Sequence, residues 1–188
     1  MKIAFVKHKS KLVMLILVSL IVILSILIYN SHSKINSIIL GNDIEELSDV
    51  DNTFTSSFMT STMLLKMLEN DASKVIGDKI VKLSSLIKES TEIHINIGSV
   101  DINNLLTINY DKEILERQSE IVISNISNII DLIVKHTKNS TIKIYGLVNS
   151  YDNNDETLID FYSAFNTNLE NLILSKQTKI SFLSFLFQ

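Results

Sequence analysis

Residues 92–98, Glu-Ile-His-Ile-Asn-Ile-Gly, alternate isoleucine with polar side chains. In extended backbone, successive side chains point to opposite faces, so this alternation predicts a half-buried β-strand with His94 exposed on its polar face. Residues 141–148, Thr-Ile-Lys-Ile-Tyr-Gly-Leu-Val, alternate in the same way and predict another strand. A shorter strand is expected over 105–110. These segments predict a small sheet in the second half of the chain.

Helical periodicity flanks these strands. Residues 111–136 carry an apolar stripe at three- and four-residue steps, and Asp111 is placed to cap the helix. Residues 157–174 predict a further helix. Residues 57–89 predict one long amphipathic helix, with Gly77 as a point where it breaks. That helix is either a stalk or dimerising coiled coil, or the first helix packed on the domain.

The last residues are apolar and aromatic, which is unusual because chain ends are normally polar and frayed. Phe182, Phe185 and Phe187 are candidate interaction residues here. The segment is expected to be a strand that completes the sheet, or else a tail that docks on a partner. Together the elements predict an α+β fold, in which helices pack on a small sheet.

Residues 12–29, Leu-Val-Met-Leu-Ile-Leu-Val-Ser-Leu-Ile-Val-Ile-Leu-Ser-Ile-Leu-Ile-Tyr, contain no charged side chain. As a helix they would extend roughly 27 Å, close to the thickness of a bilayer core. Lysines at positions 2, 7, 9 and 11 precede this stretch, so the positive-inside rule predicts an N-terminus in the cytoplasm. A cleaved signal peptide is the alternative.

This topology divides the chain into four expected parts. Residues 1–11 form a basic cytoplasmic tail, and 12–29 form a transmembrane anchor. Residues 30–56 form a polar acidic linker, and 57–188 form an extracytoplasmic domain. The expected localisation is the inner membrane, with a single span and most of the chain in the periplasm or outside the cell.

Composition restricts the chemistry. The chain has no cysteine and a net charge of −4, so it offers no disulfide or thiolate, and its acidic outer part is a poor partner for nucleic acid. The histidines do not stand at metal-ligand spacing, and no hydrolase or phosphate-loop motif occurs. The sequence therefore predicts a protein that is not an enzyme, with no catalytic residue, cofactor or metal.

Residues 108–174 resemble the first part of an OmpA-like domain, as found in the flagellar stator protein MotB and other peptidoglycan-binding envelope proteins. The similarity lies in Ile108-Asn-Tyr-Asp111 before a long helix, and in Ile142-Lys-Ile-Tyr-Gly146 as the next strand. The family's Gly-His-Thr-Asp and arginine-containing motifs are absent. The resemblance implies a scaffold that has lost wall binding, with Asn149 and Ser163 at vestigial ligand-site positions.

The expected function is a non-enzymatic, membrane-anchored structural or interaction subunit of a bacterial envelope assembly, of the secretion, motor or division type. Its expected partners are the membrane, other envelope proteins and a second copy bound through residues 57–89. The alternative is a ligand-sensing or cell-wall-binding domain of the OmpA-like type.

Overall fold

A computed structural model describes a large part of the chain. The described residues are 14, 17–25, 35–44, 47, 53–107, 111–137, 139–148, 155–176 and 180–183. The chain divides into two compact units, residues 1–34 and residues 35–188. Each unit is described by itself.

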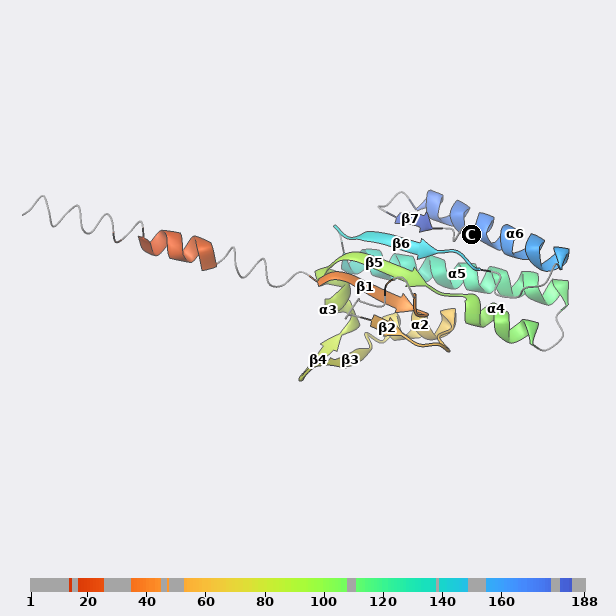
Figure 1. The fold of residues 1–188 in the computed structure, drawn as a ribbon, viewed down its shortest axis with the longest axis horizontal. Coiled ribbons are helices and arrows are strands. Elements are labelled where there is room, and N and C mark those ends of the chain that lie inside the picture. Colours follow the sequence, from red (N-terminus) through yellow and green to blue (C-terminus); the bar gives the residue numbers. More distant parts are fainter. Residues whose placement is uncertain are drawn as a thin grey trace, which may run out of the picture. The chain divides into compact units, whose positions relative to one another are not determined.

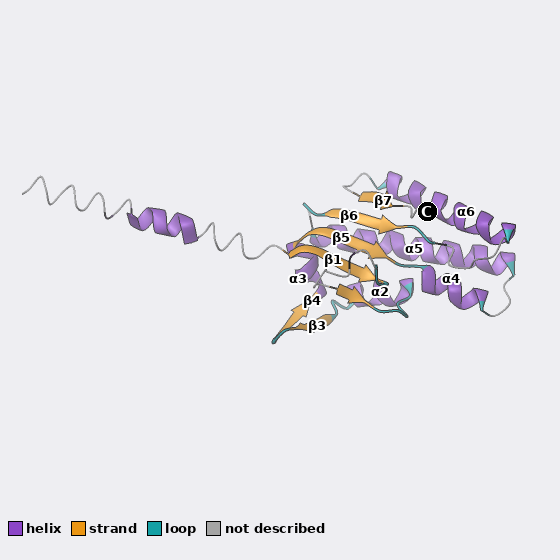
Figure 2. Cartoon of the chain, viewed as in Figure 1, coloured by secondary structure: helices purple, strands orange, loops and turns teal. Residues whose placement is uncertain are grey.

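The second unit contains a five-stranded sheet of order β2-β1-β5-β6-β7. Its strands are β1 (Ile35–Gly41), β2 (Thr53–Thr55), β5 (Ser90–Asn96), β6 (Thr141–Tyr145) and β7 (Ile180–Leu183). Each neighbouring pair runs parallel, and the arrows of the central strands point the same way in Figure 2. A parallel sheet joined by helices is an α/β fold, so the predicted α+β class is wrong.

Helices follow the strands along the chain. They are α2 (Ser61–Glu69), α3 (Leu83–Glu89), α4 (Ser99–Leu106), α5 (Lys112–His136) and α6 (Glu156–Ser175). The long helix α5 runs along the sheet in Figure 1, with α6 beside it. Helix α5 contacts α2, α3, α4 and α6, and so forms the centre of the helical layer.

Both faces of the central strands are buried. Ile38, Ile93 and Ile142 belong to the main core, which also includes apolar side chains of the described helices. On the opposite face Ile39 and Tyr145 form a second buried cluster. His94 lies on this opposite face and is only 3% exposed, so the expectation that it is an exposed strand residue is wrong. Parallel strands are normally covered on both sides, which alternation alone does not reveal.

The long helix predicted over 57–89 is wrong. Helix α2 begins after Thr60, whose hydroxyl accepts from the Met63 main chain, and it ends near Asp71, which has φ of 48°. A two-stranded antiparallel hairpin follows, made of β3 (Ser73–Ile76) and β4 (Lys79–Lys82). Gly77, with φ of 58°, lies in its turn. There is no continuous helical face here for a stalk or for pairing with a second copy.

The later helices agree with the sequence. Helix α5 has Asp111 as its N-cap, and the Asp111 carboxylate accepts from the Glu113 main chain at 3.1 Å. Helix α6 covers the segment predicted over 157–174. The short strand expected over 105–110 is not found in its described part, because Leu105 and Leu106 belong to α4. Residues 108–110 lie outside the described residues.

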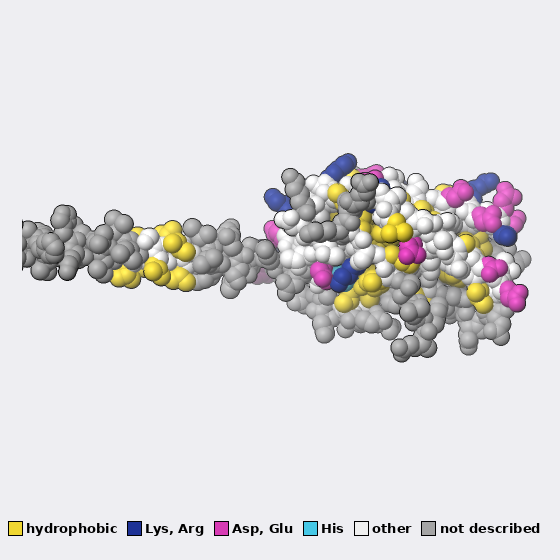
Figure 3. Space-filling view, turned by 90° about the horizontal axis from the view of Figure 1, so that it is seen from above, with side chains coloured by type: hydrophobic (Ala, Val, Ile, Leu, Met, Phe, Trp, Pro, Cys, Tyr) yellow, Lys and Arg dark blue, Asp and Glu magenta, His cyan; other side chains and the backbone are white. Residues whose placement is uncertain are grey.

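The first unit is described only in part, as residue 14 and a helical segment over 17–25 whose apolar side chains are exposed (Figure 3). Among the described residues, no helix is both long enough and apolar enough to cross a membrane. This finding contradicts the predicted single transmembrane helix, the membrane as a partner and the single-pass inner-membrane localisation. The bounds 12–29 stay a prediction, because residues 12, 13, 15, 16 and 26–29 lie outside the described residues. The cytoplasmic tail over 1–11 lies outside the described residues.

Candidate functional site

Three of the four glycines of the chain follow three adjacent strands of the sheet. Gly41 ends β1, Gly98 follows β5 and Gly146 follows β6. Gly41 and Gly98 have φ of 103° and 110°. Residues other than glycine rarely adopt such positive φ values. A Cβ on Gly41 would lie 2.2 Å from the Asn96 carbonyl oxygen. The glycines thus allow the backbone to turn sharply at the carboxyl edge of the sheet.

The carboxyl ends of β1 and β5 meet where the strand order reverses. From β1 the chain continues to one side of the sheet as β2, and from β5 it continues to the other side as β6 and β7. In open α/β sheets, ligands bind outside the carboxyl ends of the strands at such a switch point. A ligand site is therefore expected at this edge.

Asn42 is a buried polar side chain at this edge. It is 8% exposed, and its Nδ2 donates to the carbonyl oxygens of Ser56 and Met59 at 3.0 and 3.3 Å. Its main-chain N–H donates to the Asn96 carbonyl at 2.6 Å. These bonds fix the orientation of the Asn42 amide. Its Oδ1 accepts a hydrogen bond from the Ser99 hydroxyl at 3.1 Å.

Ser99 lies on a sharp strand-to-helix turn. Strand β5 ends at Asn96, Gly98 adopts the left-handed conformation and α4 begins at Ser99. No side chain caps this helix at Gly98, so the first-turn N–H groups of α4 can bind a ligand oxygen. Ser99 is half-buried, which leaves its hydroxyl partly accessible at the edge.

Asp43 follows Asn42 directly in the loop after β1 and adds a carboxylate to this loop. Its side chain is exposed, and its carbonyl oxygen accepts from Asn96 Nδ2 at 3.0 Å. That bond ties the loop after β1 to the end of β5. The edge thus combines a hydroxyl, a carboxylate and uncapped helix N–H groups.

A buried polar cluster supports the edge from the helical side. The carboxylate of Asp101 accepts from the N–H and the hydroxyl of Ser61 at 2.8 and 2.9 Å. Asn125 Nδ2 donates to the Ser61 hydroxyl at 3.0 Å. Burial raises the pKa of Asp101 above its ordinary value. This cluster fixes α4, and hence Ser99, against α2 and α5.

A second polar cluster crosses the opposite face of the sheet, away from the edge. His94 Nδ1 lies 2.8 Å from the Tyr145 hydroxyl, and His94 Nε2 lies 3.3 Å from a Glu92 carboxylate oxygen. Lys143 Nζ is 3.0 Å from the same Glu92 oxygen, which lowers the pKa of Glu92. Burial, and next the charge of Lys143, lower the pKa of His94. Within the described residues, no hydrogen bond joins His94 to a serine.

Few of the residues singled out from the sequence lie at this edge. Phe182 is half-buried on β7, where it pairs with Ile144. Ser163 is exposed on α6. Asn149, Phe185 and Phe187 lie outside the described residues, so the structure does not test their predicted roles. Metal-binding groups of three or more acidic, histidine or cysteine side chains are absent from the described residues.

Asn42, Asp43 and Ser99 were not predicted as site residues from the sequence. A signal was present: each of three glycines directly follows an Ile-rich segment, as in Ile-Ile-Leu-Gly41, Ile-Asn-Ile-Gly98 and Ile-Tyr-Gly146. A strand that runs into glycine is typical of the carboxyl edge of a parallel sheet. The first segment was instead assigned to an acidic linker over 30–56, although β1 is an interior strand between β2 and β5.

Comparison with solved structures identifies the type of fold. The lipase Lip_vut3 from a goat rumen metagenome superimposes with a TM-score of 0.61 at 16% sequence identity, over 79% of this chain and 80% of that one. An extracellular lipase from Streptomyces rimosus aligns with a TM-score of 0.49 at 10% identity, over 78% and 79% of the two chains. The sequence matches no protein-family model and no curated protein.

The likeness to Lip_vut3 establishes a lipase-like α/β fold. The OmpA-like resemblance is therefore wrong: it rested on one strand-helix-strand-helix segment, which parallel α/β folds also contain. The lipase-like fold also contradicts the interpretation as a non-enzymatic envelope subunit, and the alternative of an OmpA-like sensing or wall-binding domain. The statement that the chain is not an enzyme rested on the lack of a recognisable motif, and this fold overturns it.

Proposed function

We propose that this protein is a hydrolase of small carboxylic esters that acts at the carboxyl edge of β1 and β5. The observation that carries the proposal is the position of Ser99, a half-buried serine on a strand-to-helix turn at the switch point of a lipase-like sheet. A serine on such a turn presents its Oγ above the sheet, where a substrate carbonyl can reach it.

In the proposed reaction, Ser99 Oγ attacks the ester carbonyl carbon and its proton passes to the Asp43 carboxylate. The oxyanion that forms is stabilised by main-chain N–H groups in the first turn of α4. The alcohol leaves with the proton, and water then releases the acid from Ser99. Asn42 is a positioning residue, because its amide holds the Ser99 hydroxyl but cannot accept a proton from it.

Labelling and kinetics test this proposal together. A fluorophosphonate probe is expected to modify Ser99, as read by mass spectrometry of the peptide that contains it. Hydrolysis of p-nitrophenyl acetate is expected to fall roughly a thousandfold or more in S99A, since nucleophile loss removes the covalent route. Asp43→Asn is expected to lower kcat by roughly a hundredfold, the usual effect of losing a general base.

The matched control is S163A, which removes an exposed serine on α6. This variant is expected to keep both labelling and activity. The proposal would be overturned if the probe did not label the wild type and the wild type had no esterase activity. It would also be overturned if S99A remained as active as S163A.

A further inference from the structure

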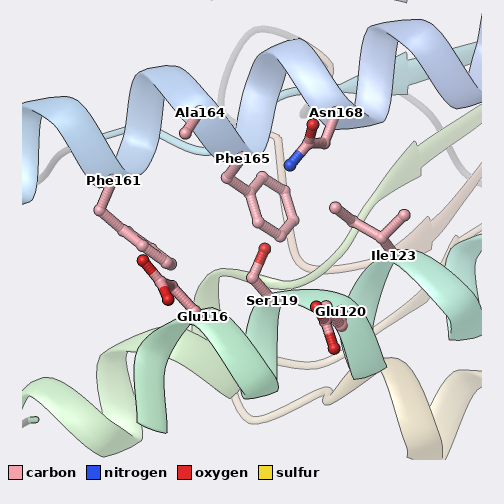
Figure 4. A pocket seen from close by; sticks show the side chains of 8 residues that line it. All are labelled: Glu116, Ser119, Glu120, Ile123, Phe161, Ala164, Phe165 and Asn168. Atoms are coloured by element: carbon pink, nitrogen blue, oxygen red, sulfur yellow. The ribbon is translucent and has the colours of Figure 1, made fainter. Parts of the chain in front are cut away.

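A groove of about 270 Å³ lies between α5 and α6. Its residues come from the first two-thirds of both helices, and Figure 4 shows them facing one another across the gap. Phe161, Ala164 and Phe165 of α6 and Ile123 of α5 provide its apolar surface. Its polar lining is Glu116, Ser119, Glu120 and Asn168.

Ser119 indicates that this groove receives a polar ligand. The residue is 7% exposed, and Figure 4 shows its hydroxyl pointing into the space near Phe165. Within the described residues, Ser119 Oγ forms no hydrogen bond, although serines in helices commonly bond a carbonyl of the preceding turn. Ser119 Oγ is not among the fully buried polar atoms that lack a partner, so it opens into the groove, where a ligand group can replace water as its hydrogen-bond partner.

The charge around the groove favours a cation. Glu116 and Glu120 are both exposed at its rim, and Glu116 extends beside the Phe161 ring in Figure 4. Glu116 also forms a weak exposed ion pair with Lys112, whose Nζ is 3.9 Å away.

We propose that this groove binds a small organic cation, an ammonium group attached to an apolar body. The ammonium lies at the rim between Glu116 and Glu120, and donates one hydrogen bond to Ser119 Oγ. The apolar body packs on Phe161, Ile123 and Ala164, and the Phe161 ring face also attracts a cation. This site is separate from the ester-hydrolysing edge, and its occupation requires no chemistry at Ser99.

Titration of the full chain with 2-phenylethylammonium tests the proposal, with 2-phenylethanol as the neutral ligand of similar shape. The ammonium is expected to bind with a Kd of about 1 mM or below, and more tightly than the alcohol. E116Q and E120Q are each expected to weaken ammonium binding by roughly two- to fivefold, and S119A is expected to weaken it further. Ala164→Trp fills the groove from an exposed position and is expected to abolish binding.

The control variant is E170Q, which neutralises an exposed carboxylate of α6 that does not line the groove; it should bind as the wild type does. Equal affinity for the alcohol, unchanged binding in E116Q and E120Q, or no binding at several millimolar would each overturn the proposal. S99A should bind the ammonium normally, so failure of the esterase proposal and failure of this one give different results.

Discussion

The carboxylate of Asp101 in α4 accepts two hydrogen bonds from Ser61, a residue 40 positions earlier at the start of α2. Ser61 is fully buried and Asp101 is 7% exposed. Neither bond is local in sequence, so the pair joins α2 to α4, the helix that begins with Ser99. Because Ser99 lies two residues before Asp101, this pair also sets the position of the proposed nucleophile.

The first prediction concerns this pair. Asp101→Ala is expected to lower the free energy of unfolding by about 2–3 kcal/mol, since it leaves the buried Ser61 N–H without an acceptor. Urea denaturation at neutral pH measures the change. Asp160→Ala removes an exposed carboxylate from α6 and is expected to change stability by less than about 0.5 kcal/mol. Equal effects of the two variants would contradict the assigned role of Asp101.

The second prediction concerns pH. The folded-state pKa of His94 is lowered from 6.5, first by burial, so the unfolded chain binds a proton more readily than the folded one. The stability that neutral His94 contributes is therefore present above pH 6.5 and is lost as the pH falls through the lowered pKa. Unfolding measured between pH 7.5 and 5.5 should show a steeper loss in the wild type than in His94→Gln.

His136→Gln is the matched control for that experiment, because His136 is exposed at the end of α5. This variant should keep the wild-type pH dependence. At pH 7.5, His94→Gln itself is expected to cost about 1–2 kcal/mol through lost packing and the altered bond to Tyr145. A His94→Gln protein with an unchanged pH slope would show that His94 does not determine it.

The third prediction concerns the glycine that ends β1. Gly41→Ala is expected to lower stability by about 3 kcal/mol or more, because the new methyl would meet the Asn96 carbonyl oxygen and φ is unfavourable for alanine. Gly77→Ala shares the positive φ but meets nothing within 4 Å, so a cost of about 1–2 kcal/mol is expected. Thermal unfolding measures the stability of both variants. The extra loss in Gly41→Ala is the cost of the contact with the Asn96 carbonyl oxygen, apart from the cost of the positive φ.

The fourth prediction concerns the C-terminal strand. Phe182 packs against the main core and pairs with Ile144, so Phe182→Ala is expected to cost roughly 1.5–3 kcal/mol. Leu183, on the other face of β7, is 37% exposed, and Leu183→Ala is expected to cost less than about 1.5 kcal/mol. Chemical denaturation of both variants measures the difference. If Phe182→Ala were the milder change, β7 would not be a core strand.

The sequence by itself determined the local elements with strong periodicity. The stripe of α5, its Asp111 cap and the alternation in β5 and β6 are short-range properties, because turn-to-turn spacing and capping involve residues a few positions apart. The apolar end of the chain likewise indicated a strand, which is β7 over its described residues. The periodic pattern over 57–89 was misleading, because a short helix, a hairpin and another helix can together imitate the period of one long helix.

Only the tertiary structure decided the class of the fold and the site. Whether strands run parallel depends on how the chain crosses between them, and alternation within a strand does not encode that direction. The strand that pairs with β1 is β5, which begins 55 positions later in the chain. No local pattern connects the two, so β1 appeared to be part of an acidic linker. Asn42, Asp43 and Ser99 come together for the same reason: parallel strands bring their carboxyl ends to one edge, where residues distant in sequence share a site.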